Sequence, residues 1–210
     1  MNAFIALPRS FYEPSAEVVA AALLGHWLVR KTTEGPVGGI IVETEAYLVN
    51  DAACHAARGL TQRNRVMFGP PGHAYVYLIY GCHYCVNAVC QPKGTGEAVL
   101  IRAIEAKTGL SFLRRHRAQV SERELTNGPG KLCQAMKIDR TLDGVDLCDP
   151  HSLLVIAENP EVKVFRRKQG PIVRTVRVGI TRAAELPLRF YLDGSSFVSQ
   201  RRRRNARAAP

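Results

Sequence analysis

Residues 75–89 read Tyr75-Val-Tyr-Leu-Ile-Tyr-Gly-Cys-His-Tyr-Cys-Val-Asn-Ala-Val89, two strand-like runs on either side of one glycine. Successive side chains of a strand point to opposite faces. Gly81 is the residue most free to take positive φ, so the turn is expected there. Pairing that is symmetric about Gly81 puts Tyr77 opposite Cys85 and on the same face as Asn87. The stretch predicts a β-hairpin with Tyr80 beside its tip.

The rest of the chain predicts strands and helices that do not alternate regularly. This pattern favours an α+β fold over a doubly wound α/β fold. Pro14 suits the first position of a helix and Gly25 the residue after its end. We expect a turn containing Glu34-Gly-Pro36 between the first two strands. The expected strands are 26–31, 38–47, 99–104, 153–157, 173–180 and 188–192, and the expected helices are 14–25, 110–119 and a short one within 127–136.

The 210 residues suffice for one domain with a substantial core, and 46% hydrophobic with 22% charged residues is ordinary globular composition. We expect one domain over residues 1–200 and a disordered, arginine-rich tail over 201–210. No apolar run approaches the ~18 residues of a membrane span. The N-terminus has no basic residue before its apolar part, unlike a secretion signal. These features predict a cytoplasmic protein.

The net charge is +11, and the body stays basic without the five arginines of the tail. A basic body favours a polyanionic partner, above all nucleic acid. The other interpretation is a solubility effect. Of the six cysteines, only Cys82 and Cys85 form a CxxC pair, and on a strand their sulfurs would point to opposite faces. We therefore expect six reduced thiols that fill space, and no metal site.

Two carboxylates, Glu43 and Glu45, follow the apolar run Gly39-Ile-Ile-Val42 and share one face of the expected strand. A buried carboxylate costs several kcal/mol unless it is paired. The pair therefore belongs either to salt bridges with arginines or to a functional cleft. Tyr47 lies two residues further along the same face.

The tyrosines and basic residues near this strand have two interpretations. Bases stack on aromatic side chains, but tyrosines are also common in strand cores. Tyr75 and Tyr84 fit the core better, whereas Tyr80 at a hairpin tip has little core to join and could act as a wedge in DNA. His55 alone fits an ordinary loop histidine. Contacts to phosphates are possible for Arg63, Arg65 and Lys131.

Together these segments resemble the alkyladenine (3-methyladenine) DNA glycosylase family of base-excision repair. The resemblance spans roughly residues 11–199, and the ordered set of motifs is far more specific than any one of them. Its anchors are VETEAY (42–47), His55, RNR (63–65) with Met67-Phe68, YVYLIYG (75–81), Asn87, VLIR (99–102) and NGPGKLCQA (127–135). The resemblance implies a single compact α+β domain with a mostly antiparallel curved sheet, flanking helices and a protruding hairpin.

The resemblance also implies a role for each matching residue. Glu45 matches the general base that activates a water, and Arg102 a residue that holds this water. Tyr47, His55 and Tyr77 match the walls that stack on a flipped base. Asn87 matches a floor residue that disfavours the guanine amino group, and Tyr80 the residue that fills the gap in the duplex. The residues expected at the DNA are Tyr80, Arg63, Arg65, Met67 and Lys131.

The implied reaction is hydrolysis of the N-glycosidic bond of an alkylated or deaminated purine in double-stranded DNA, which leaves an abasic site. No lysine lies in residues 40–87, which carry most of these motifs, so we expect a monofunctional, monomeric enzyme without metal or other cofactor and with no membrane partner. Two other functions stay open. A non-catalytic nucleic-acid binder would release no base, and an enzyme for free nucleosides would need no duplex.

Overall fold

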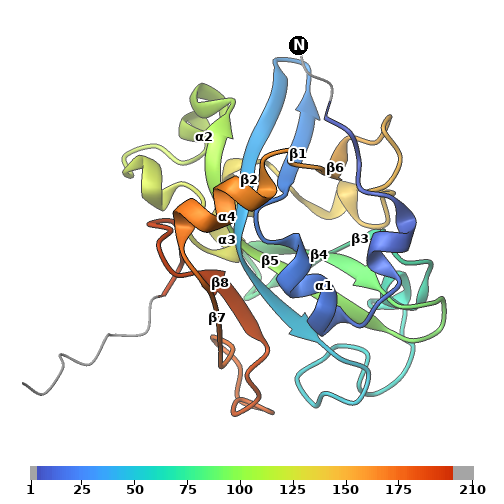
Figure 1. The fold of residues 1–210 in the computed structure, drawn as a ribbon. Coiled ribbons are helices and arrows are strands. Elements are labelled where there is room, and N and C mark those ends of the chain that lie inside the picture. The colour runs from blue at the N-terminus through green and yellow to red at the C-terminus, as the bar shows by residue number, and fades with distance from the viewer. Residues whose placement is uncertain (1–3, 201–210) are drawn as a thin grey trace, which may run out of the picture.

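The longest strand, β2 (Gly35–Tyr47), lies at the centre of the fold. The protein is described here by a computed structural model of residues 4–200. β2 pairs along one edge with β5 (Glu97–Thr108), and along the other with β1 (Trp27–Thr32) and then β8 (Arg189–Leu192). Figure 1 shows β2 crossing the whole molecule, with α1 and α4 nearer the viewer.

The sheet is antiparallel at every pairing, in the order β3-β4-β5-β2-β1-β6, with β7 joined through β8. β6 spans Leu154–Ala157 and β7 spans Ile172–Thr175. The strands curl around one main hydrophobic core. The predicted α+β class with a curved antiparallel sheet is confirmed.

Close backbone packing explains the two glycines at the start of β2. A Cβ at Gly38 would lie 2.0 Å from the carbonyl oxygen of Leu28, and one at Gly39 would lie 2.0 Å from that of Glu105. The pairing of β2 with β5 also shifts register between the two glycines. A bulge of this kind bends a strand and increases its twist.

The helices cover the sheet and its ends. α1 (Ala16–Leu23) packs on β2, where the Thr44 hydroxyl donates to the carbonyl of Ala20. α3 (Pro129–Ala135) packs on β4, while α2 (Leu110–His116) follows β5 and α4 (Val162–Gln169) precedes β7. Four short 3-10 turns span Arg9–Tyr12, Arg65–Phe68, Glu122–Glu124 and Arg140–Leu142. No helix within residues 4–200 is long and apolar enough to cross a membrane.

The predicted hairpin is confirmed in register. β3 (Ala74–Ile79) pairs with β4 (His83–Cys90), and Tyr77 lies opposite Cys85, as symmetry about Gly81 requires. The turn differs in one detail, because both Tyr80 and Gly81 take positive φ, 53° and 70°. Tyr80 is 78% exposed at the tip.

Several predicted boundaries were wrong. The first helix starts at Ala16, so Pro14 precedes it and Ser15 is its N-cap. Pro36 lies within β2, opposite Lys31, not in the turn. The predicted helix 110–119 ends at His116 and the predicted strand 173–180 ends at Thr175. α4 was not predicted, because its sequence is mostly basic and no residue of it is buried. The predicted tail, 201–210, lies outside the described residues.

Candidate active site

Glu45 is a fully buried carboxylate near the end of β2. Its Oε1 accepts a hydrogen bond of 2.7 Å from the backbone N–H of Val178. Its Oε2 accepts one of 3.1 Å from the hydroxyl of Tyr47 and lies 3.2 Å from Nη1 of Arg102. These partners come from a loop, from β2 itself and from β5. Each of them favours the ionised carboxylate.

Glu43, two residues earlier, has a different environment. Its Oε1 lies 2.9 Å from Nε of Arg102 and 2.7 Å from Nε of Arg189. Both the backbone N–H and the hydroxyl of Ser199 donate to it, at 2.7 and 2.9 Å. Glu43 therefore has two arginine partners where Glu45 has one, and Arg102 connects the two acids.

The pKa values of the two acids shift in opposite directions. Burial, the largest influence, raises the pKa of Glu45, and Arg102, the Val178 amide and the Tyr47 hydroxyl offset this only in part. Burial also raises the pKa of Glu43, but Arg102, Arg189 and Ser199 outweigh it, so that this pKa is lowered. A carboxylate with a raised pKa is the more basic one, which suits Glu45 to accept a proton.

The three partners of Glu45 line a cavity of about 290 Å³ between the hairpin and the loop after β7. Its walls are mostly aromatic and apolar, with few polar groups, as is usual for sites that bind flat organic groups. The lining residues are Tyr47, Ala53, His55, Met67, Tyr75, Tyr77, Ile79, Tyr80, His83, Cys85, Asn87, Ala98, Leu100, Arg102, Pro129, Gly130, Val178, Gly179 and Ile180.

Stacked and edge-on rings form one wall of the cavity. The rings of Tyr75 and Tyr77 stack with centroids 5.2 Å apart, and His55 meets Tyr77 edge-on at 4.5 Å. Nδ1 of His55 lies 2.9 Å from the Tyr75 hydroxyl. Although His55 as a residue is exposed, desolvation by these neighbours and the charge of Arg63 lower its pKa. A neutral ring is thus favoured at neutral pH.

Asn87 and Cys85 come from β4 and face the same cavity. Asn87 is buried, and its Nδ2 donates to the carbonyl of Tyr75 at 3.0 Å, which fixes the amide. Burial raises the pKa of Cys85 to about 11, so its thiol stays protonated at neutral pH. All six cysteines are free, but Cys82 is exposed and fills no space in the core, contrary to prediction.

The residues expected at the DNA fall into two groups. Tyr80, Arg63, Arg65 and Lys131 are exposed. Arg63 lies with its guanidinium 5.6 Å from the Tyr77 ring centre, and Lys131, at the start of α3, donates to Asn127. Met67 is only 3% exposed and belongs to the small apolar cluster below the tyrosines. Because it also lines the cavity, the contact with DNA that is open to it is with a base held in the cavity.

The sequence matches known proteins over nearly its whole length. Residues 10–196 match the family model described as Methylpurine-DNA glycosylase (MPG). The chain belongs to the methylpurine-DNA glycosylase family. The family predicted from the motifs and the class of enzyme, a monofunctional DNA glycosylase of base-excision repair, are thereby confirmed.

Relatives of this glycosylase occur in archaea and bacteria. The chain is 51% identical to a protein of Methanoculleus marisnigri over 93% of this chain and 99% of that one. It is 48% identical to a protein of Carboxydothermus hydrogenoformans, with the same shares covered, and 50% identical to one of Rhizobium meliloti over 91% and 95%. All three are provisionally named 3-methyladenine DNA glycosylases.

The site of this glycosylase contains residues that were not predicted. Val178 contributes only a backbone N–H, which no sequence motif can indicate. Arg189 and Ser199 contact Glu43 across 146 and 156 residues of sequence. Arg177 forms a buried salt bridge with Asp51, 126 residues away. The sequence offered one signal, two acids expected to be buried in a chain rich in arginine. This indicates that arginine partners exist but does not identify them.

Proposed function

We propose that this glycosylase hydrolyses the N-glycosidic bond of damaged purines with a water activated by Glu45. The observation that carries the proposal is the buried Glu45, with its raised pKa, behind an aromatic-lined cavity of about 290 Å³. A water between Glu45 and the sugar would lose its proton to the carboxylate as the base departs. General-base assistance of this kind contributes about 10²- to 10⁴-fold in rate.

The second role of Glu45 is electrostatic. Positive charge develops on the sugar as the glycosidic bond breaks, as in other glycoside hydrolyses. An ionised carboxylate next to that charge stabilises it, most effectively where water is excluded. Arg102 keeps the carboxylate in place at 3.2 Å and would hold the water on the other side. Its salt bridge to Glu43 fixes the guanidinium for this purpose.

The cavity would hold the base after it leaves the duplex. Tyr47, Tyr77 and His55 would contact its faces and edges, and Asn87 would meet the groups that distinguish guanine. Stacking on aromatic rings is worth about 1–3 kcal/mol per base. Alkylated purines with a positive charge stack well on electron-rich rings and are good leaving groups. We therefore expect alkylated purines to be substrates, and deaminated purines where the site also assists the neutral leaving group.

The surface around the cavity would bind the duplex. Tyr80 lines the cavity mouth at the exposed hairpin tip, where it could enter the space of the flipped nucleotide. Arg63, Arg65 and Lys131 would contact phosphates, and Met67 would support the base from below. An enzyme for free nucleosides would have no use for an exposed tyrosine at this position.

We further propose that residues 1–200 act as one glycosylase domain in a monomer; residues 4–200 surround one main hydrophobic core, as a single domain would. A cytoplasmic location fits six cysteines that all remain free.

The experiment that tests the proposal identifies the released base. The protein is incubated with duplexes that carry alkylated purines or hypoxanthine, and with the matching free nucleosides. We expect free damaged bases and abasic sites from the duplexes only. Release of the base from nucleosides at an equal rate would contradict a DNA substrate. If no substrate released a base, the protein would be a non-catalytic nucleic-acid binder.

A further inference from the structure

Arg177 is a buried cation directly behind one wall of the cavity. The residue is 4% exposed and lies in the loop after β7. Its guanidinium carbon lies 4.7 Å from the ring centre of Tyr47. The same group donates to the carbonyl oxygens of Ala46 and Ala183, at 3.0 and 3.2 Å. None of the catalytic and binding roles proposed above uses this residue.

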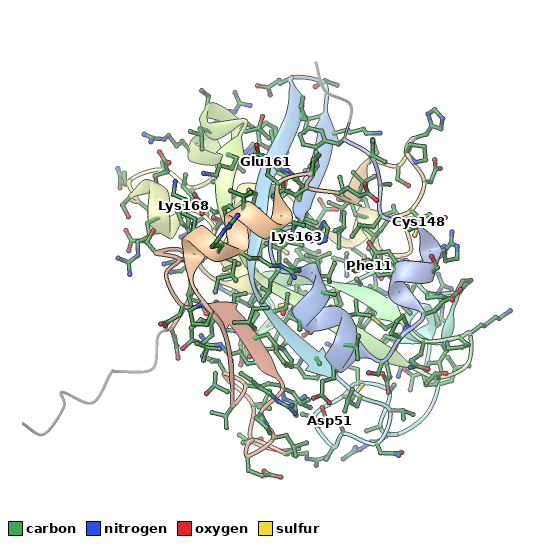
Figure 2. All side chains as sticks on the ribbon, in the orientation of Figure 1. Phe11, Asp51, Cys148, Glu161, Lys163 and Lys168 are labelled. Atoms are coloured by element: carbon green, nitrogen blue, oxygen red, sulfur yellow. The ribbon has the colours of Figure 1, made fainter. Side chains whose placement is uncertain are left out.

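A salt bridge joins Arg177 to the loop after β2. Both terminal nitrogens of Arg177 donate to the carboxylate of Asp51, one of them at 2.9 Å. Asp51 is buried and also accepts from the backbone N–H of Ala53, which lines the cavity. In Figure 2, Asp51 lies in the loop below the end of β2, beside the segment that follows β7. The salt bridge thus connects two loops on either side of Tyr47.

Arg177 lies next to both neutral hydrogen-bond donors of Glu45. Val178, the residue after Arg177, supplies the backbone N–H at 2.7 Å from Oε1. Tyr47, whose ring lies against the guanidinium, supplies the hydroxyl at 3.1 Å from Oε2. A shift of Arg177 would therefore disturb one donor on each carboxylate oxygen.

We propose that the Arg177–Asp51 salt bridge is a latch that positions Tyr47 and the Val178 amide on Glu45, which makes Arg177 a positioning residue of the reaction. This inference rests on the proposed role of Glu45.

Stability alone does not explain the latch. Buried salt bridges are often replaced by apolar residues without loss of stability, because desolvation offsets their attraction. Nε of Arg177 is buried and has no hydrogen-bond partner among the described residues. The guanidinium carbon lies over the Tyr47 ring, so the group serves this ring contact as well as the salt bridge to Asp51.

The charges of Arg177 and Asp51 also influence the protonation of Glu45. A loss of the Arg177 cation leaves Asp51 uncompensated, which makes protonation of Glu45 easier. When both charges are lost together, their opposite effects on the pKa of Glu45 largely cancel. The other titratable or charged groups that face Glu45 are Arg102 on β5, Cys85 on β4, and Glu43 and Tyr47 on β2, with Arg189 on β8 beside Glu43.

The test compares three variants with the wild type: Arg177→Gln, the double variant Asp51→Asn/Arg177→Gln, and the control Arg174→Gln. Arg174 lies three residues earlier, on β7, and pairs with the partly exposed Glu17. For each, single-turnover base release from a 3-methyladenine-type or hypoxanthine duplex is measured against pH. Affinity for the same duplex and thermal unfolding are measured in parallel.

We expect Arg177→Gln to slow base release by roughly 10- to 100-fold, the effect typical of misplaced catalytic groups. The acid limb of its pH profile should move to higher pH, with little change in affinity for the duplex. The double variant should regain the thermal stability of the wild type, and the acid limb of its pH profile should return to the wild-type position. Its base release should stay slow. Arg174→Gln should match the wild type.

A double variant that regains the full rate together with its stability would overturn the latch, because Arg177 would then serve the fold alone. A loss of affinity as large as the loss of rate would also overturn it. Glu45→Gln, assayed alongside, separates the two proposals. If this variant keeps the wild-type rate, the proposed function fails. If it is inactive while the double variant is fully active, only the latch fails.

Discussion

Glu43 and Glu45 show how two identical side chains on one strand acquire opposite properties. Glu43 contacts two arginines and two donors of Ser199, whereas Glu45 shares Arg102 and otherwise meets only neutral donors. The sequence predicted that the pair would be either salt-bridged or functional. In the structure both acids contact Arg102, but only Glu43 has a second arginine, and Glu45 is the acid to which we assign the proposed function. The choice between them depended on Arg189 and Ser199, which lie too far along the chain for any local pattern to indicate.

This difference predicts the effect of Glu43→Gln on stability. The change leaves Arg102 and Arg189 buried without their shared anion, which should lower the free energy of unfolding by roughly 3 kcal/mol at pH 7. The folded-state pKa of Glu43 is lowered, so its stabilisation is present above the unfolded pKa and lost as pH falls through the folded one. Urea unfolding of both proteins from pH 7 to pH 3 measures this. The gap between them should narrow with falling pH, and a constant gap would refute the assignment.

At the scale of elements, the hairpin was predictable and the loop after β7 was not. The alternation of side chains between the two faces of a strand, together with Gly81, sufficed to predict which residues of β3 and β4 lie opposite each other. This works because the pairing is local in sequence. The segment Val176–Ile180 looks like a strand, but its backbone N–H at Val178 bonds to Glu45 instead of to a neighbouring strand. β7 ends at Thr175, before this hydrogen bond to a distant carboxylate. α4 was missed because no residue of it is fully buried: the partly buried Phe165 packs on the core, and Arg166 donates to the carbonyls of Ala22 and Leu24.

The hairpin tip carries a prediction of its own. Tyr80→Ser should slow base release from duplex DNA more than from single strands, since only a duplex leaves a gap to fill. The matched control is Leu78→Ser, because Leu78 is exposed on the same hairpin two residues before the tip. Single-turnover rates on both substrates decide the matter. An equal loss on duplex and single strands would show that Tyr80 does not act as a wedge.

At the scale of the whole molecule, the positive charge favours DNA but does not locate the contact. The net charge of +11 was evident from the sequence, whereas the site depends on which basic residues lie around the cavity. Folding separates Arg63, Arg65 and Lys131, which stay exposed, from Arg102, Arg177 and Arg189, which are buried against carboxylates. Local sequence around these arginines does not reveal the difference, because their acidic partners are distant.

The salt dependence of DNA binding tests whether the exposed basic residues contact DNA. The affinity of the protein for a lesion duplex should fall steeply as salt rises, and Lys131→Gln should reduce the slope of log K against log salt by about 1. Lys168→Gln is the control, because this lysine extends from α4, which contributes no residue to the cavity (Figure 2). Fluorescence anisotropy over a range of salt concentrations gives both slopes. Equal slopes for the two variants would exclude Lys131 from the contact.

The general-base role of Glu45 is tested most directly by single-turnover base release with Glu45→Gln. The amide keeps the shape of the side chain but cannot take a proton from water. The account predicts that this variant binds the lesion duplex as tightly as the wild type and produces abasic sites at least 100-fold more slowly. Glu34→Gln, at the exposed turn before β2, should retain the wild-type rate. A Glu45→Gln enzyme that releases the damaged base at the wild-type rate would contradict the account.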